Sequence, residues 1–346
     1  MKLIKVGITH GDINGISLEL ITKALAAPEL LEICTPVVFS HDKCFMLASG
    51  LTEIEQPVPL EVIASAKEVM DGRVNLVNVC GTDTEVQWGQ QTETGLKAEA
   101  DSLNAAIEAF KNHQIDVLVC APGRLDNDLD SHSLSDFIRQ ASGAESKDFD
   151  WIIDGDVRTL KLHSLAFTTE LGEGMAIEAF MSDMNDINRQ LREDFGMLRP
   201  RIAVVSGNEK LGGDIKELQE SGMVVFGPFE AKDFIETGKA QHYDAVLFLE
   251  QEQERHQLIK GFCAENLIGY VSGLPIVLTY PLTGVCYDKA GKGVSDESSL
   301  RTAIYAAIDI YRRRSDYAAA ISHPLEKQWN PKGRDDFKLD LTKEDN

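Results

Sequence analysis

The stretch GLPIVLTYPLTGVCYDKAGKGVSDESSL, Gly273–Leu300, carries the clearest fold signal in the sequence. Its first part, Leu274–Thr279, is short and rich in apolar and β-branched residues, which predicts a buried strand. A loop containing several glycines follows. Over Leu300–Tyr311 the apolar residues recur at helical spacing, and Ser298 or Asp296 is placed to cap this helix. The stretch therefore predicts a strand, a loop and a helix in succession.

The loop between that strand and that helix contains residue types that suit an anionic ligand. They are Asp288, Gly291, Lys292, Gly293 and Asp296. Glycines let backbone N–H groups approach a ligand closely, and a helix N-terminus favours anionic groups. The pattern is compatible with a phosphate or a dinucleotide. A Gly-Lys-Gly sequence also occurs as an ordinary connection between a strand and a helix, so both interpretations are open at this point.

Alternating strand and helix patterns continue through the rest of the chain. Strands are predicted at Leu3–Thr9, Pro36–Phe39, Asn75–Val79, Ile115–Cys120, Thr159–Phe167 and Arg201–Ser206, and helices at Ser17–Ala26, Thr94–Asn112 and Ala176–Phe195. Repeated units of this kind predict an α/β fold with a largely parallel sheet covered by helices on both faces. Ligands of such folds bind at the carboxyl ends of the strands.

Length and composition narrow the class of protein. With 346 residues the chain exceeds the usual size of one domain, so two domains with a cleft between them are expected. The formal net charge of −22 disfavours nucleic acid or an anionic membrane as a partner. The sequence has no secretory signal and no apolar run of membrane-spanning length, which predicts a cytoplasmic protein. Its 6 cysteines lack CxxC spacing, so neither a zinc ribbon nor a disulfide framework is expected.

Several separated blocks of the chain resemble the 4-hydroxythreonine-4-phosphate dehydrogenase (PdxA) family. AGKGVSDESS, preceded by GLPIVLT, is similar to the family's C-terminal signature, and the opening GITHGDINGI (Gly7–Ile16) is similar to its N-terminal one. IDVLVCAPG (Ile115–Gly123), RPRIAVVSGN (Arg199–Asn208) and GPFEAKDF with YDAVLFLEQ (Gly227–Gln251) follow in the family's order. The resemblance covers about the first nine-tenths of the chain and is specific for the fold.

The resemblance implies an architecture like that of the isocitrate and isopropylmalate dehydrogenases. That architecture has two α/β/α domains with largely parallel sheets, an active-site cleft between them, and a homodimer. Residues 1–124 with 285–323 would form the first domain, and residues 125–284 the second domain and the dimerisation region. Residues 324–346 would be a polar C-terminal tail.

The resemblance also implies an activity. The family oxidises a secondary alcohol of a small phosphorylated metabolite with NAD, in pyridoxal phosphate biosynthesis, and carbon dioxide is then lost from the product. A divalent cation assists both steps as a Lewis acid. For this chain the resemblance places NAD at the Asp288–Asp296 loop, on Asp288, Gly291, Lys292, Gly293 and Asp296.

The family's metal ligands are largely missing here. The family uses three histidines, and one has a clear counterpart, His163 in LKLHSLAF. At the second position this chain has Asn208-Glu209-Lys210, and Glu250–Glu254 occupies the third. One imidazole does not hold a divalent ion usefully, so His163 is either a remnant ligand or a hydrogen-bonded core residue. The glutamates of EQEQE would supply hard ligands for magnesium, or they form an exposed face.

Substrate-contacting positions are altered as well. By resemblance, substrate contacts fall on Asp12, on Ser135, which keeps a hydroxyl beside the histidine-replacing Leu134, and on Lys260, near a family lysine. Leu278 stands where the family has an arginine, which removes a bidentate phosphate ligand.

Two hypotheses follow from this selective loss. In the first, the chain is a working NAD-dependent dehydrogenase with a changed substrate, with or without a metal, and Lys210 is the electrophilic or proton-transfer group. In the second, it is a catalytically impaired paralogue that binds a nucleotide or metabolite, or pairs with an active subunit. Where groups act as a unit, the effects of losing them are not additive and the loss of one can already remove most of the activity, which favours altered or impaired chemistry.

Overall fold

In this computed structural model, the described residues are 3–52, 59–79, 81, 84–124, 138–139, 149–153, 162–164, 177–249 and 267–322, with only the backbone described for 150, 162–164, 177–179 and 241. The strands are β1 (Ile4–Thr9), β2 (Cys34–Ser40), β3 (Leu60–Ile63), β4 (Val74–Asn78), β5 (Val117–Cys120), β6 (Phe149–Ile153), β7 (Leu162–Ser164), β8 (Arg201–Val205), β9 (Val224–Phe229), β10 (Ala245–Phe248), β11 (Ile268–Ser272) and β12 (Val277–Pro281). The α-helices are α1 (Ser17–Leu25), α2 (Leu30–Ile33), α3 (Asp42–Ser49), α4 (Glu93–Lys111), α6 (Ile177–Phe195), α7 (Leu211–Glu220), α8 (Ala231–Glu236) and α10 (Ser298–Ser322).

All of these strands belong to one sheet of 12 strands in the order β3-β4-β2-β1-β5-β12-β11-β6-β7-β10-β8-β9. The pairs are parallel except β12 with β11, β11 with β6, and β6 with β7. The predicted α/β class and largely parallel sheet are confirmed. The sheet is continuous across the two predicted domains, because β12, assigned to the second, pairs in parallel with β5 of the first. The domain division itself stays a prediction.

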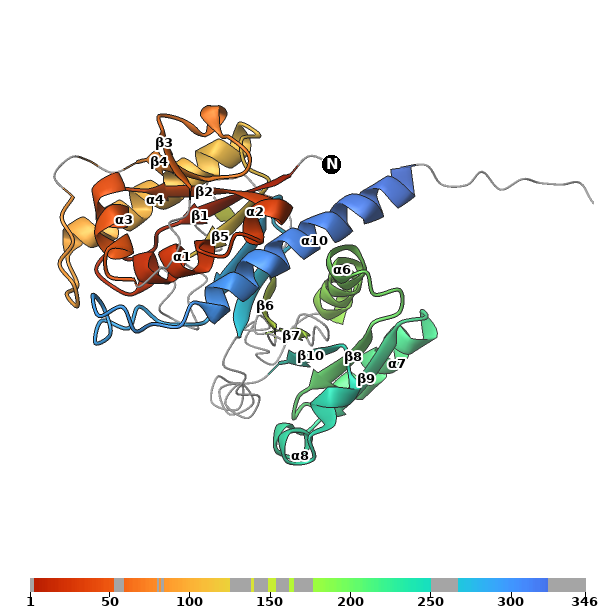
Figure 1. Ribbon diagram of the computed structural model, residues 1–346. Coiled ribbons are helices and arrows are strands. Elements are labelled where there is room, and N and C mark those ends of the chain that lie inside the picture. The colour runs from red at the N-terminus through yellow and green to blue at the C-terminus, as the bar shows by residue number, and fades with distance from the viewer. Residues whose placement is uncertain are drawn as a thin grey trace, which may run out of the picture.

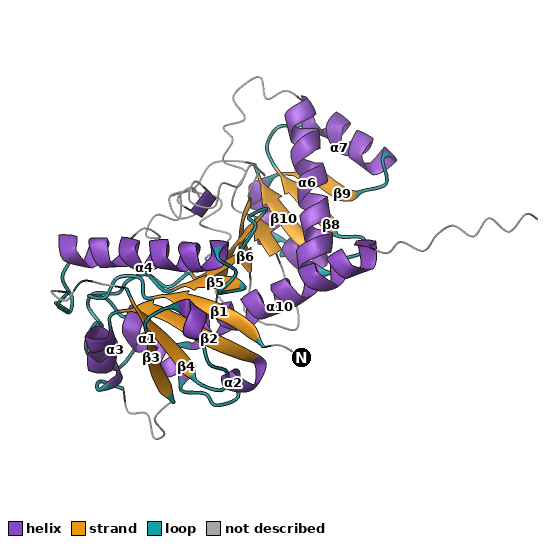
Figure 2. Cartoon of the chain, turned by 90° about the horizontal axis from the view of Figure 1, so that it is seen from above, coloured by secondary structure: helices purple, strands orange, loops and turns teal. Residues whose placement is uncertain are grey.

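Helices cover both faces of the sheet because successive strand residues point to opposite sides. In β5, Val117 and Val119 pack with α1 and α10, whereas Leu118 and Cys120 pack with α4. Figure 2 shows α4 over one face, with α1 and α10 on the other. α10 runs through the middle of the molecule, between the part that holds β1–β5 and the part that holds α6, α7 and α8, and lies beside α6 (Figure 1).

Most predicted elements appear with shifted ends. Two of these shifts concern the strand and the helix predicted from the Gly273–Leu300 stretch. The strand predicted at Leu274–Thr279 begins three residues later and ends at Pro281, because the preceding residues form the turn between β11 and β12. Gly273 takes the positive φ of 83° that this turn needs. The helix predicted at Leu300–Tyr311 spans Ser298–Ser322 instead, since the arginines after Tyr311 are a partly solvated, ion-paired helix face.

The described residues contain no helix with the length and apolar character needed to cross a membrane.

Candidate active site at the carboxyl ends of β1, β5 and β12

Three adjacent parallel strands, β1, β5 and β12, end at the same edge of the sheet, and the loops after them pack on one another. The loop after β1 turns at Gly11, whose φ is +62°. The N–H of Asp12 then donates to the carbonyl of Pro122 after β5, at 3.0 Å. A Cβ on Gly11 would lie 2.2 Å from that carbonyl oxygen, so only glycine fits. The close approach of the two loops therefore depends on this residue.

Asp12 is the centre of a polar cluster that joins all three loops. Its side chain is fully buried, and Oδ1 accepts the N–H of Asn14 at 2.9 Å. Oδ2 accepts the hydroxyl of Tyr287, at 2.5 Å, and lies 3.2 Å from Nε of Arg124. Burial and the hydrogen bond to Asp12 raise the pKa of Tyr287, so its hydroxyl remains a donor. We refer to Asp12, Arg124 and Tyr287 as the Asp12 cluster.

The cluster is also tied to the start of α4. Asn14 accepts the N–H of Gln87 at 2.7 Å and donates to the hydroxyl of Thr92 at 2.8 Å. Thr92 caps α4, since its hydroxyl accepts the N–H of Gly95 at 3.0 Å. The N–H of Arg124 donates to the Glu99 carboxylate at 3.0 Å. These hydrogen bonds fix the Asp12 cluster to α4 and to the segment before it.

His10, one residue before the turn, is fully buried and neutral. Its Nδ1 lies 2.7 Å from the carbonyl of Gly11, which identifies Nδ1 as the protonated ring nitrogen. Burial lowers the pKa of His10 to about 4. His10 therefore supplies no positive charge to this edge of the sheet near neutral pH.

The glycine-rich loop is held by a buried ion pair of α1. Glu19, 1% exposed, accepts the N–H groups of Gly293 and Ser295, at 3.2 and 2.6 Å. Lys23 bonds to Glu19 at 2.9 Å and donates to the carbonyls of the same two loop residues at 2.8 and 2.6 Å. Gly291, with φ +74°, lies against Trp88, where a Cβ would come within 2.7 Å of the ring. The hydrogen bonds to Glu19 and Lys23 and the packing against Trp88 together fix the path of the loop.

These contacts limit how the loop can bind an anion. The N–H groups of Gly293 and Ser295 already meet a carboxylate, so they are not directed at a phosphate. Asp288, Lys292 and Asp296 are exposed, and Lys292 donates to the carbonyl of Asp288 at 2.6 Å. The Asp296 carboxylate accepts the N–H of Ser298 at 3.1 Å where α10 begins, which settles the predicted cap in favour of Asp296. A dinucleotide would therefore meet mainly exposed side chains here.

Lys210 lies apart from the Asp12 cluster within the chain. It is an exposed residue directly before α7, and its N–H donates to the side chain of Asn208 at 3.1 Å. Five strands separate β8 from β5 in the sheet, which is about 29 Å measured across the strands. The structure therefore does not bring Lys210 together with Asp12.

Several predicted site residues lie outside the described residues. These are Ser135, Lys260 and Glu250–Glu254, while for His163 only the backbone in β7, paired with Val246 and Ile152, is described. Among the described residues no three His, Cys, Asp or Glu side chains are grouped to hold a metal ion. Lys210 brings positive charge to the position of the family's second histidine. The described residues do not fit a three-histidine metal site, and we derive no reaction step through a metal.

Two side chains of the cluster, Arg124 and Tyr287, were not predicted as site residues. The available signal was their position, since each follows a strand whose carboxyl end lies at the predicted ligand edge. Glu19 was not predicted as a site residue either. Its position in a regular helix does not reveal that its partners lie in the glycine loop.

The chain is an α/β protein with a buried polar cluster at the carboxyl ends of its central parallel strands. The family model "Pyridoxal phosphate biosynthetic protein PdxA" matches residues 32–307. The chain belongs to the PdxA family, as the resemblance predicted.

Comparisons with individual proteins agree with this assignment. The chain is 32% identical to a 4-hydroxythreonine-4-phosphate dehydrogenase of Bacteroides thetaiotaomicron, over 99% of each chain. It is 23% identical to a D-threonate 4-phosphate dehydrogenase of Cupriavidus necator, over 90% of this chain and 98% of the relative. A solved 4-hydroxythreonine-4-phosphate dehydrogenase structure from Klebsiella pneumoniae has a TM-score of 0.68 at 19% identity, covering 89% of this chain and 99% of that one. This structural likeness supports the fold.

Proposed function

We propose that the chain is an NAD-dependent dehydrogenase that oxidises a CH–OH group of a small phosphorylated hydroxy acid. The Asp12 cluster carries the proposal, because it places a cationic group and a hydroxyl oxygen at the carboxyl edge beside the glycine-rich loop. Membership of the PdxA family and the names of the relatives, 4-hydroxythreonine-4-phosphate and D-threonate 4-phosphate dehydrogenases, support this substrate class. A homodimer and a cytoplasmic location belong to the same proposal.

The residues have distinct roles in this proposal. Arg124, partly exposed and held by Asp12 and Glu99, binds an anionic group of the substrate, which offsets the repulsion expected from a net charge of −22. Tyr287 stays protonated and gives its one hydroxyl hydrogen to Asp12, so its oxygen accepts a hydrogen bond from the substrate hydroxyl and orients the substrate rather than removing its proton. Asp12 positions both groups. Proton transfer by Lys210 requires that it come from the second subunit of the proposed homodimer, because within one chain five strands lie between β5 and β8.

The cofactor would be held beside the cluster. Asp288, Lys292 and Asp296 are the exposed side chains that would contact NAD, and Gly291 and Gly293 allow the loop its close path along Trp88 and Leu51. NAD, when bound, supplies the hydride acceptor for the alcohol carbon.

The test is a thermal-shift titration of the full chain with NAD, followed by NADH formation with 4-hydroxythreonine 4-phosphate and with D-threonate 4-phosphate. Saturating NAD at about a hundred times its Kd should stabilise the protein by about 2.7 kcal/mol. Tyr287→Phe should lower kcat/KM at least about tenfold, since a substrate hydrogen bond is lost. Tyr305→Phe, on α10, is the matched control and should keep wild-type turnover.

A second candidate function has its own supporting observation. Asp12 has no exposed surface, and Glu19 occupies the N–H groups of the glycine loop, so both inherited motifs also serve packing. A catalytically impaired paralogue that binds a nucleotide or metabolite would show a shift with NAD and no turnover. Absence of both the shift and NADH formation would contradict the dehydrogenase proposal.

A further inference from the structure

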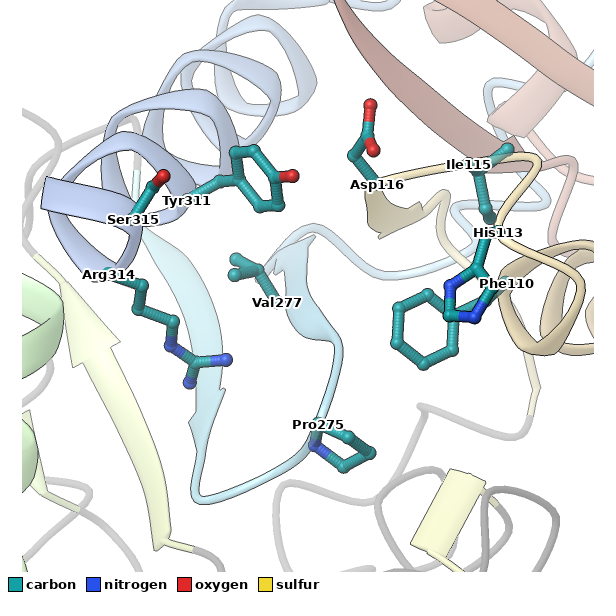
Figure 3. Close-up of a pocket in the computed structure, with 9 residues that line it drawn as sticks. All are labelled: Phe110, His113, Ile115, Asp116, Pro275, Val277, Tyr311, Arg314 and Ser315. Atoms are coloured by element: carbon teal, nitrogen blue, oxygen red, sulfur yellow. The ribbon is translucent and has the colours of Figure 1, made fainter. Parts of the chain in front are cut away.

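A cavity lies at the opposite ends of two of the strands that build the candidate active site. It has a volume of about 360 Å³ and opens at the amino ends of β5 and β12, between the C-terminal end of α4 and the second half of α10 (Figure 3). Its lining residues are Phe110, His113, Ile115, Asp116, Pro275, Val277, Tyr311, Arg314 and Ser315. This volume falls in the range of pockets that take small metabolites.

One wall of the cavity presents a fixed cationic group. The guanidinium of Arg314 points toward the centre of the cavity in Figure 3. Its Nε and Nη2 bind the Asp194 carboxylate, Nη2 also donates to the hydroxyl of Tyr270 at 2.7 Å, and Nη1 donates to the carbonyl of Leu274 at 3.1 Å. Among the described residues this leaves one N–H of Nη1 without a partner. Because the planar group is held on three sides, little conformational entropy is lost when it binds an anionic oxygen.

The facing wall has the opposite electrostatic character. Asp116 accepts the N–H of Lys5 at 2.8 Å and is hydrogen-bonded to Tyr311, which leaves acceptor capacity on its carboxylate. The C-terminal end of α4 lies on the same side, where the helix dipole is negative. His113, just after the end of α4, has a φ of 57°. This wall favours a positively charged group.

Between the two walls the cavity is apolar. Ile115 and Val277 are buried, and Phe110 and Pro275 also line this part of the cavity. An apolar side chain fits this part because it replaces water against the ring of Phe110.

From this arrangement we propose that the cavity binds a small zwitterion, an α-amino acid with an apolar or aromatic side chain. Its carboxylate meets Arg314, its ammonium group meets Asp116 and the end of α4, and its side chain covers Phe110 and Val277. A doubly charged anion is disfavoured by Asp116, and a simple amine by Arg314. The site is separate from the proposed reaction, since it lies at the amino ends of the strands.

Calorimetric titration of the full chain, without NAD or substrate, tests the charge pattern with three matched probes. These are L-phenylalanine, 3-phenylpropanoate, which lacks the ammonium group, and phenethylamine, which lacks the carboxylate. The expected result is that L-phenylalanine binds at least ten times more tightly than either analogue. Equal binding of an analogue, or no binding of L-phenylalanine, overturns the proposal.

Two variants locate the binding. Ser315→Trp fills the cavity from an exposed position of α10, and should weaken binding of L-phenylalanine at least tenfold. The control Ala320→Trp, exposed on the same helix and outside the cavity lining, should change it less than twofold. Asp116→Asn keeps a hydrogen-bond acceptor for Lys5. It should weaken the binding of L-phenylalanine but not the binding of 3-phenylpropanoate. Unchanged binding to Ser315→Trp, with its melting temperature retained, would refute this location.

Discussion

The loops at the carboxyl ends of β1, β5 and β12 differ sharply from the loop that follows β8. In the first group, buried charges join residues that are far apart in the sequence, such as Tyr287 to Asp12 across 275 positions. After β8, Asn208 and Lys210 are exposed and their backbone N–H groups bond to side chains two residues away. The first group is fixed by tertiary contacts, and the second by local turn chemistry.

This difference explains what each region can tolerate. In the buried loops a substituted residue meets a backbone or a charge that cannot move away, so the fold constrains the residue type. The loop after β8 carries Lys210 on a solvated surface, where the fold sets few limits on the side chain. Similarity to the family in the buried loops therefore indicates a shared architecture. The departure from the family in the loop after β8 indicates a change in the chemistry instead.

Among the substitutions that test this difference between the two regions, Gly11→Ala should have the largest effect on stability. The new Cβ would lie 2.2 and 2.6 Å from two backbone oxygens, at a φ of +62°, so we expect a loss of at least about 4 kcal/mol of unfolding free energy. Gly72→Ala is the control, because φ is +76° there but no atom lies within 4 Å of the Cβ position. It should cost only about 1 kcal/mol. Urea denaturation measures both, and equal losses would show that the close approach is unimportant.

Glu19→Gln tests the buried ion pair that holds the glycine-rich loop. It leaves Lys23 without its carboxylate and turns an amide toward the N–H of Gly293 or Ser295, so we expect a loss of about 3 kcal/mol. Glu32→Gln, exposed on α2, should be neutral in the same denaturation experiment. A matching neutral result at Glu19 would mean that this loop is not fixed by α1.

His10 should make stability depend on pH. Its pKa is lowered to about 4 in the folded protein, from 6.5, so the unfolded chain binds more protons between these values. Stability is therefore complete above about pH 6.5 and falls as the pH decreases toward 4. Between pH 7 and pH 5 this residue should account for a loss of about 2 kcal/mol. His10→Gln should show a correspondingly smaller loss in denaturation experiments at the two pH values, and identical losses would contradict a neutral buried His10.

Lys210→Ala should have the smallest effect on stability. Because the side chain is exposed, the free energy of unfolding should stay within about 0.5 kcal/mol of wild type. The same variant sharpens the functional side of the comparison, since proton transfer by Lys210 predicts at least about a hundredfold lower kcat. Lys216→Ala, exposed on α7, serves as the control. Wild-type turnover of Lys210→Ala would exclude the proposed role.

Much of the architecture could be predicted from the sequence. Short apolar runs and helical spacing predicted β1, α1, α4 and β8 to within about two residues, because these patterns reflect local periodicity. The ends of β12 and α10 were predicted less well. The β12 start depends on a hairpin with β11, and the α10 end on ion pairs to α6, neither of which is visible locally.

What the sequence by itself determined is the α/β class, the carboxyl-edge position of the candidate site loops and the family, since each follows from patterns within short segments. The tertiary structure decided which groups meet. It placed Glu19 rather than an open cradle against the glycine loop and joined Arg124 and Tyr287 to Asp12. It also set Lys210 after β8, with five strands between β8 and β5, which Arg124 follows. The physical reason is that hydrogen bonds and ion pairs act over a few ångströms, so their partners depend on how distant segments pack.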